Sequence, residues 1–536
     1  MWRVKSLDAI LATAEKKSLH RSLGPVQLTL LGIGAIIGTG IFVLTAAASQ
    51  KAGPGMMVSF VIAGAVCAVA ALCYSELAAM APVSGSAYTY TYAVMGELLA
   101  WTVGWALILE YAVAASAVSV GWSGYVLGLI EQGLGFNFPD LLSAGPTWSM
   151  NGFIPTPDFS VGIVNIPAIV VALLVTGLLM LGTTESARVN AFLVLIKVAA
   201  LTVFIVITLP VIKTANLSPF APNGMFGAYS GMGVVGAAAS IFFAYVGFDA
   251  VSTAAEETKN PQRNVPIGLI GSLAICTIFY LLVALGAAGA IGAQPVLGAA
   301  GEAVQPGSPA FVAACALPAN ADALVCSNEA LAHVLRVIGH PQIGNALGTA
   351  ALLALPSVIL MMIYGQTRIF FVMARDGLLP EGLTKIHSKW KTPYIVTAFT
   401  GIAVAIGGAL FPVGQLADIS NSGTLFAFFM VSIAVLVLRV KDPNRKRPFR
   451  TPLIWVFAPL SAFGCAFLFW NLPHDAKLVL PIWGAVGLVI YFLYGYRKSH
   501  VGQGLIEVPE LSPDAPGGPV PPMPGAPAPG SKEERD

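Results

Sequence analysis

Long apolar segments, separated by short polar stretches, alternate along almost the whole chain. A helix of about 20 residues is long enough to cross the hydrocarbon core of a bilayer. Apolar segments of about this length or longer occupy residues 25–48, 55–80, 96–129, 162–182, 189–212, 230–254, 265–292, 344–373, 394–413, 418–438, 452–471 and 479–496. The pattern therefore predicts an all-α polytopic membrane protein with twelve spanning helices.

The first apolar segment contains a concentration of glycine. Residues 32–42 read GIGAIIGTGIF, with four glycines in nine positions, and each glycine costs about 1 kcal/mol relative to alanine inside a helix. Gly34 and Gly38 have the spacing of a small-residue face that packs closely against another helix. Alternatively, the helix stops near Ile36 and restarts near Gly40. The main-chain groups left unpaired by such a break are tolerated only where they line a cavity.

The sixth apolar segment has a second candidate break, because residues 240–250 read SIFFAYVGFDA and place Gly247 and Asp249 beside aromatic residues at membrane depth. The two breaks hold matching positions if the first ten segments form two repeats of five, and such pairs indicate a transporter's binding site. The expected organisation is an N-terminal segment (1–24), two repeats (25–212 and 230–438), two further helices (452–496) and a disordered Pro/Gly-rich tail (499–536).

Broken helices present partial charges of both signs. The N–H groups that begin a half-helix after Thr39 suit a carboxylate, and carbonyl groups freed at the breaks suit an ammonium group. Together they match the two charged groups of an α-amino acid. The candidate substrate-binding residues are Ile36, Thr39, Gly40, Ile41, Phe243, Ala244, Val246 and Glu110.

Lys197 and Glu110 are charged residues inside predicted spans. Lys197 lies about eight residues, or about 12 Å, into the fifth span. Ionisable residues at such depth usually serve function, which favours a coupling role for Lys197. The alternatives are snorkelling to the interface and a static ion pair with Glu110 or Asp249. For Glu110, substrate binding, proton relay and a polar contact within the bundle stay open.

Other acidic residues lie near the predicted ends of spans. Glu76 is expected at the cytoplasmic interface, and Asp418 near the outer surface, where it need not be buried. Glu256 and Glu257 close the sixth span as gate residues or as a solvated end.

Composition excludes several functional classes. Charged residues make up 10% and hydrophobic residues 56% of the 536 positions, whereas about a quarter of the residues of a soluble protein are charged. No basic–aromatic patch indicates nucleic acid binding, and scattered histidines do not predict a metal site. P-loop, dinucleotide-binding, HExxH and GxSxG patterns are absent. We therefore expect neither an enzyme nor a cofactor.

Lysine and arginine residues are unevenly distributed over the predicted loops. With both termini in the cytoplasm, 23 of the 28 lie on the cytoplasmic side, four on the outer side and Lys197 within a span. This bias predicts a multi-pass plasma-membrane protein with both termini cytoplasmic. Cys315 and Cys326 share the outer loop 293–343 and can form a disulfide in an oxidising compartment. Two unpaired cysteines are the slightly favoured alternative.

Several motifs along the chain belong together: GIGAIIGTGIF at 32–42, YSEL at 74–77, PVSGSAYTY at 82–90, FAYVGFDAVSTAAEETKNP at 243–261, GQTR at 365–368 and ARDGLLP at 374–380. This set resembles the cationic amino acid transporter family of the amino acid–polyamine–organocation (APC) superfamily, over roughly residues 20–500. The predicted number of spans, twelve, is similar to that of the bacterial members of the family.

The resemblance implies a leucine-transporter-like 5+5 inverted repeat with discontinuous helices 1 and 6, plus two additional C-terminal helices. It implies that Lys197 fills the space that sodium occupies in sodium-coupled relatives, with Ser357 close by. Pro356, beside Ser357, departs from the family pattern.

The expected function is import of L-amino acids coupled to protons by alternating access. The alternatives are an exchanger, a sodium-coupled carrier or a non-transporting amino acid receptor. Family resemblance does not fix the substrate, and Glu110 alone does not establish cationic selectivity. The expected partners are the amino acid, protons and the lipid bilayer; no partner subunit is indicated.

Overall fold

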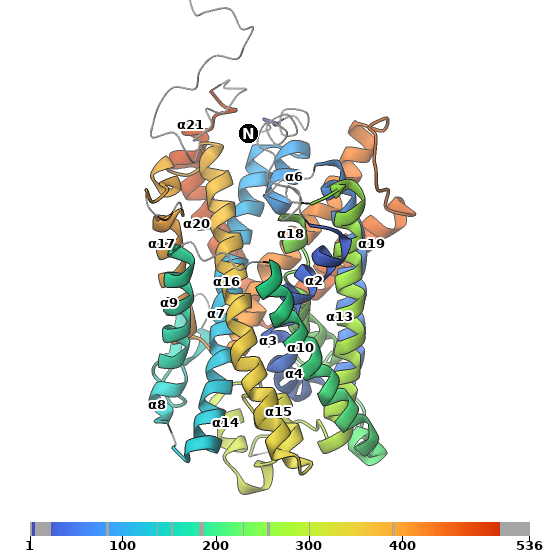
Figure 1. Ribbon diagram of the computed structural model, residues 1–536, viewed down its shortest axis with the longest axis vertical. Coiled ribbons are helices and arrows are strands. Elements are labelled where there is room, and N and C mark those ends of the chain that lie inside the picture. The colour runs from blue at the N-terminus through green and yellow to red at the C-terminus, as the bar shows by residue number, and fades with distance from the viewer. Residues whose placement is uncertain are drawn as a thin grey trace, which may run out of the picture.

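A computed structural model describes residues 3–5, 23–81, 85–136, 138–151, 154–181, 187–228, 230–253, 258–299, 301–388, 390 and 392–503. Most of its helices run along one long axis (Figure 1). In this part of the chain the departure from the all-α prediction is an antiparallel hairpin, β1 (Thr147–Asn151) with β2 (Ile154–Asp158). The predicted disordered tail, from residue 504 on, and most of the N-terminal segment lie outside the described residues.

The elements follow the apolar segments. The α-helices are α2 (Pro25–Ile36), α3 (Thr39–Phe42), α4 (Leu44–Ala52), α5 (Met56–Met80), α6 (Ser86–Val94), α7 (Glu97–Leu134), α8 (Asp140–Ser143), α9 (Ile166–Met180), α10 (Ala187–Thr208), α11 (Gly233–Ile241), α12 (Ala250–Thr253), α13 (Pro261–Ile291), α14 (Pro309–Cys315), α15 (Ala330–Val337), α16 (Pro341–Arg375), α17 (Tyr394–Leu410), α18 (Val413–Lys441), α19 (Ile454–Trp470), α20 (His474–Ile490) and α21 (Tyr496–Lys498). Short 3-10 turns are η1 (Gly53–Gly55), η2 (Leu209–Val211), η3 (Thr214–Leu217), η4 (Phe242–Tyr245), η6 (Pro318–Asn320), η7 (Leu324–Cys326) and η8 (Glu381–Thr384), and η9 (Tyr491–Gly495) is a π-helical turn.

Each of the twelve predicted segments coincides with helical residues. By length and composition, seven helical stretches of the described chain can cross a membrane: Leu44–Met80, Glu97–Gly133, Ala191–Val211, Pro261–Ile291, Pro341–Arg375, Val413–Lys441 and His474–Lys498. Five shorter apolar helices accompany them. The helical polytopic membrane class is confirmed, and the number of twelve crossings stays a prediction.

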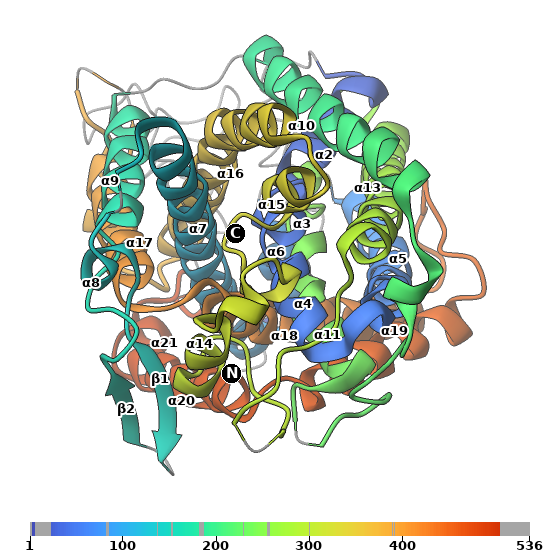
Figure 2. The ribbon, with the colours of Figure 1, turned by 90° about the horizontal axis from the view of Figure 1, so that it is seen from below.

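The glycine-rich first segment lies inside the bundle. α2 packs against α13 and α10, α3 against α7 and η4, and α4 against α11 and α5. Viewed from below, α3 and α4 lie inside a ring of helices that includes α7, α16, α10 and α13 (Figure 2). Every residue of α3 is buried. The fold therefore surrounds the candidate break with protein.

The two ends of the bundle differ. One end carries α6 and α21, the last helix of the described chain, and we call it the terminal face (Figure 1). The other carries α8, α14 and α15, and we call it the disulfide face because Cys315 and Cys326 are joined there.

Candidate functional site between two interrupted helices

Helical structure is interrupted in both of the segments singled out above. The helix that begins at Pro25 ends at Ile36, and α3 begins at Thr39. In the sixth segment, α11 ends at Ile241 and the chain continues as the 3-10 turn η4. Turn residues follow before α12 begins. This local geometry matches the break interpretation rather than an unbroken packing helix.

The two interrupted segments touch through their main chains. A Cβ atom added to Gly40 would lie 2.3 Å from Ala244 Cα. Gly247 has a φ of +109°, and a Cβ there would lie 2.9 Å from Ala35 O. Glycine tolerates both the positive φ and the close approach. Gly40 therefore brings α3 against η4, and Gly247 brings the chain after η4 against α2.

Some of the predicted binding groups already have main-chain partners. Ile41 N–H donates to the carbonyl three residues earlier at 3.3 Å, and Val246 N–H donates to Phe243 O at 3.1 Å. The first N–H groups of a helix have no acceptor within that helix, which applies to Thr39 and Gly40 in α3. The Thr39 hydroxyl is buried and has no hydrogen-bond partner among the described residues. The start of α3 therefore offers donors to a carboxylate.

Tyr280 of α13 connects the two breaks, and the sequence analysis missed it. Its hydroxyl lies 2.9 Å from Ile36 O and 2.9 Å from Ala244 O. A hydroxyl has one proton, so it donates to one of these carbonyls at a time. Tyr280 is the one tyrosine of α13, which also carries the hydroxyl groups of Ser272 and Thr277, so the sequence offered no signal that singled it out.

Lys197 of α10 reaches the first interrupted segment. Its ammonium group donates to Gly34 O at 2.9 Å and to Ser357 Oγ at 3.3 Å. Only 1% of the residue is exposed, so it does not snorkel to the interface. Ser357 lies on α16, which continues as one helix through Pro356. The structure thus brings together the two residues predicted to act in coupling.

Glu110 of α7 is also buried at membrane depth. Neither carboxylate oxygen has a hydrogen-bond partner among the described residues; the neighbouring Thr424 hydroxyl instead donates to Ser420 O at 3.2 Å. The next residue, Tyr111, donates to Asp249 Oδ2 at 2.9 Å. Glu110 and Asp249 therefore lie near each other, on α7 and beside the second break.

Asp418, expected near the outer surface where it need not be buried, is buried. Asp418 Oδ2 lies 3.1 Å from Lys51 Nζ, and the Ser240 hydroxyl contacts both side chains. The two charged side chains are 8% and 7% exposed. This cluster links α4, α11 and α18 on the side of the breaks toward the disulfide face.

Glu76 is fully buried as well, with a residue exposure of 0%, and its position at the cytoplasmic interface stays a prediction. Arg439 Nε and Nη2 each donate to it at 2.8 Å, Arg447 Nε lies 3.2 Å away, and Thr451 N–H donates at 2.8 Å. Burial and then Arg439 lower the pKa of Arg447, and Glu76 opposes this by raising it. The carboxylate joins α5, α18 and the loop before α19.

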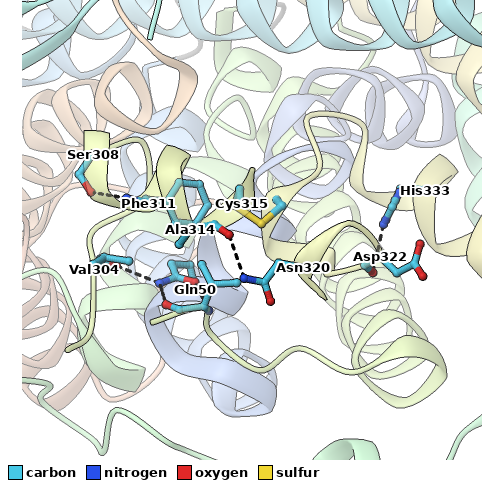
Figure 3. Close-up of a disulfide and its surroundings, with 11 residues drawn as sticks. Gln50, Val304, Ser308, Phe311, Ala314, Cys315, Asn320, Asp322 and His333 are labelled. Carbon is cyan, nitrogen blue, oxygen red and sulfur yellow. Dashed lines mark hydrogen bonds between the residues drawn. A yellow bond between two sulfur atoms is a disulfide. The ribbon is translucent and has the colours of Figure 1, made fainter. Parts of the chain in front are cut away.

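The favoured alternative of unpaired cysteines is wrong, because Cys315 and Cys326 form a disulfide (Figure 3). Gln50, at the end of α4, holds the same loop: its amide donates to Val296 O at 2.8 Å and to Val304 O at 3.0 Å, and it accepts from Val296 N at 2.9 Å. The loop is therefore tied to the helix that follows the first break.

A cavity of about 700 Å³ opens beside the Lys51–Asp418 pair. It is lined by residues from α4, α7, α11, α17, α18, α20 and the hairpin. None of the eight predicted substrate-binding residues lines it. The cavity and the interrupted helices are therefore neighbouring but separate features.

Comparisons with known proteins give the family. A family model described as "Amino acid permease" matches residues 23–493. The branched-chain amino acid permease BcaP of Bacillus subtilis is 44% identical, over 94% of this chain and 99% of that protein. The methylthioribose transporter of the same organism is 40% identical, over 93% and 98%. Cationic amino acid transporter 9 of Arabidopsis thaliana is 33% identical, over 90% and 79%. These matches confirm the resemblance to the APC superfamily: the chain belongs to the amino acid permease family, a family of transporters rather than enzymes.

Proposed function

We propose that this chain is a secondary active transporter that imports L-amino acids together with protons by alternating access. The observation that carries the proposal is the pair of facing helix interruptions, where main-chain groups of both signs converge inside an apolar bundle. Branched-chain amino acids are the first substrates to test, because permeases for them in two organisms are similar over 90% or more of the chain.

In this proposal the interrupted helices bind the two ends of the zwitterion. The start of α3 takes the carboxylate, and the freed carbonyls take the ammonium group. A carbonyl oxygen has two lone pairs. A carbonyl that already accepts a hydrogen bond from Tyr280 or from a neighbouring amide can therefore accept a second one. The residues concerned are Thr39, Gly40 and Ile41 for the carboxylate and Ile36, Phe243, Ala244 and Val246 for the ammonium group, with Glu110 beside them.

The proposed architecture is a 5+5 inverted repeat. The segment from α2 to η2 forms the first repeat and the segment from α11 to α18 the second, with α19 and α20 as additional helices. The matching places of the two interruptions, in the first and sixth apolar segments, support this assignment. The terminal face is proposed to be cytoplasmic in the plasma membrane, because a disulfide suits the opposite, oxidising side.

Lys197 is proposed to couple transport to protons. It is buried and donates to the main chain two residues before the end of α2. Losing its proton would weaken this contact, because a charge-assisted hydrogen bond is stronger than a neutral one. The protonation state of Lys197 would then favour one position of α2 over another.

Uptake by proteoliposomes under an imposed pH gradient tests the proposal. Leucine, isoleucine, valine, arginine and methylthioribose form the substrate panel. We expect the wild type to concentrate a branched-chain amino acid, and Lys197→Met to lose the dependence on the gradient. Lys213→Met, at an exposed lysine beyond the end of the same helix, is the matched control. Unchanged coupling in Lys197→Met would remove the assigned role.

The same preparation separates the alternatives. Uptake that needs internal amino acid indicates an exchanger, and uptake that needs sodium indicates a sodium-coupled carrier. Binding without flux indicates a receptor.

A further inference from the structure

A groove of about 690 Å³ lies at the terminal-face end of α13. One wall is formed by the first three turns of α13, and the other by the loop that leads from α18 to α19. Ile267 of the first wall is 43% exposed, and Pro448 and Phe449 form the second. None of the predicted substrate-binding residues lines the groove. The groove therefore opens on the outer surface of the bundle, beside a helix that is long and apolar enough to cross a membrane.

The loop wall is held in place on both sides of its two groove residues. Before them, the Arg447 guanidinium donates to Asp442 O at 2.7 Å. After them, Thr451 N–H donates to the buried carboxylate of Glu76 at 2.8 Å. A wall that is already ordered loses little conformational freedom when a ligand binds against it. The groove is therefore preformed.

Exposed basic side chains surround the groove. Arg263 lines it from α13, Lys259 precedes that helix, and Lys446 and Arg450 flank the groove residues of the loop. No carboxylate of the described residues lines it. A guanidinium donates two parallel hydrogen bonds to a phosphate group, and basic pockets beside spanning helices bind the headgroups of anionic lipids. The charge of the groove therefore suits a phosphate diester.

An exposed apolar strip on α5 continues from the groove toward the disulfide face. α5 lies between α13 and α19 (Figure 2) and packs against both. A Cβ added to Gly64 would lie 3.3 Å from α13, and Val66 lies 2.9 Å from a Cβ added to a glycine of α19. Because successive helical residues point about 100° apart, the residue between them projects outward. The exposed residues on this side of α5 are Val61, Ala65 and Ala68.

We infer that the groove is a binding site for an anionic phospholipid such as phosphatidylglycerol. The phosphate diester of the lipid lies beside Arg263, and an acyl chain extends over Ile267 and the exposed strip of α5. Apolar surface alone does not choose among phospholipids, because all of them carry acyl chains. The basic side chains select the anionic headgroup. The site is separate from the substrate-binding residues, so the inference does not depend on the proposed function.

A bound lipid connects two parts of the fold. The loop wall is anchored to α5 through Glu76. The other wall, α13, packs closely against α2, where a Cβ added to Gly268 would lie 2.9 Å from Leu28 Cβ. A lipid that contacts both walls holds α13 to the loop. Phosphatidylglycerol should therefore raise the unfolding temperature, because a ligand that binds only the native state stabilises that state.

Native mass spectrometry of the full-length protein, purified in a neutral detergent and titrated with dioleoyl phosphatidylglycerol, tests the site. We expect Arg263→Gln to bind the lipid about fivefold more weakly than the wild type, since one basic residue near a membrane surface contributes about 1 kcal/mol toward anionic lipid. Arg497→Gln is the matched control, because it removes the same charge from an exposed position of α21 on the same face. It should bind like the wild type.

Ile267→Trp is a second, independent variant, because it fills the groove without changing its charge. It should also weaken binding. Ile402→Trp, at an exposed isoleucine of α17 on the other side of the bundle (Figure 2), should not. Thermal unfolding in detergent gives a second measurement. Phosphatidylglycerol should raise the unfolding temperature of the wild type and of both controls more than that of the two groove variants.

Three results would overturn the inference. Dioleoyl phosphatidylcholine that binds the wild type as tightly as phosphatidylglycerol overturns selection by charge. Inorganic phosphate that displaces phosphatidylglycerol and stabilises the protein equally indicates a site for a free anion and overturns the lipid assignment. Equal binding of phosphatidylglycerol by the wild type and both groove variants overturns the site itself, whatever the transport assays give.

Discussion

Replacing Gly40 by alanine tests whether close main-chain contact between α3 and η4 creates the substrate site. The new Cβ would lie 2.3 Å from Ala244 Cα and 2.6 Å from Ala244 Cβ, whereas ordinary contacts begin at 3.4 Å. The segments must therefore separate by about 1.1 Å. Overpacking of this kind costs about 1–3 kcal/mol, which corresponds to a roughly 5- to 150-fold loss in affinity for leucine if the bound state requires the contact.

Gly38→Ala is the control within the same break. Its φ of −145° suits any residue, and the nearest atom to its added Cβ is Val358 Cγ1 at 3.5 Å, an ordinary contact. We expect leucine binding within about threefold of wild type, because about 0.6 kcal/mol corresponds to that factor. Ala244→Gly should not rescue Gly40→Ala, since the closest obstacle is the Cα atom.

Radiolabelled-leucine binding and proteoliposome uptake are the assays, with thermal unfolding in detergent to show that each variant is folded. The reasoning is refuted if a folded Gly40→Ala protein binds and transports leucine like the wild type. It is also refuted if Gly38→Ala is impaired to the same degree, because the effect would then not depend on the contact with Ala244.

Two further predictions concern the scaffold. Glu76→Gln should destabilise the protein by about 3–5 kcal/mol, because it removes the anion that pairs with the buried Arg447 and with Arg439, whose side chain is 19% exposed; thermal unfolding measures this, and Glu131→Gln, at an exposed glutamate, should leave the unfolding temperature unchanged. An equally small effect of both substitutions would contradict the role given to the buried carboxylate. After denaturation without reductant, four of the six cysteines should react with an alkylating reagent and Cys315 and Cys326 should not, as mass measurement of the peptides shows; modification of all six would mean that the disulfide does not form.

The sequence alone established the features that depend on a residue's own segment. The lengths of the apolar stretches determined the membrane class, because a helix can remain in lipid only if its side chains are apolar and its main chain is internally bonded. The glycines at 32–40 and the Gly247–Asp249 stretch located the interruptions, since glycine weakens a helix wherever it lies. The motifs along the chain were specific enough to indicate the family.

Tertiary structure alone decided which polar groups meet. Lys51 and Asp418 are 367 residues apart in the chain, and Glu76 and Arg439 are 363 apart. Hydropathy reports whether a segment prefers lipid, but not which neighbour covers a charge, so the burial of Asp418 and Glu76 could not be predicted. Tyr280 was missed for the same reason: its hydroxyl has a role only because two carbonyls from different helices come within 2.9 Å of it.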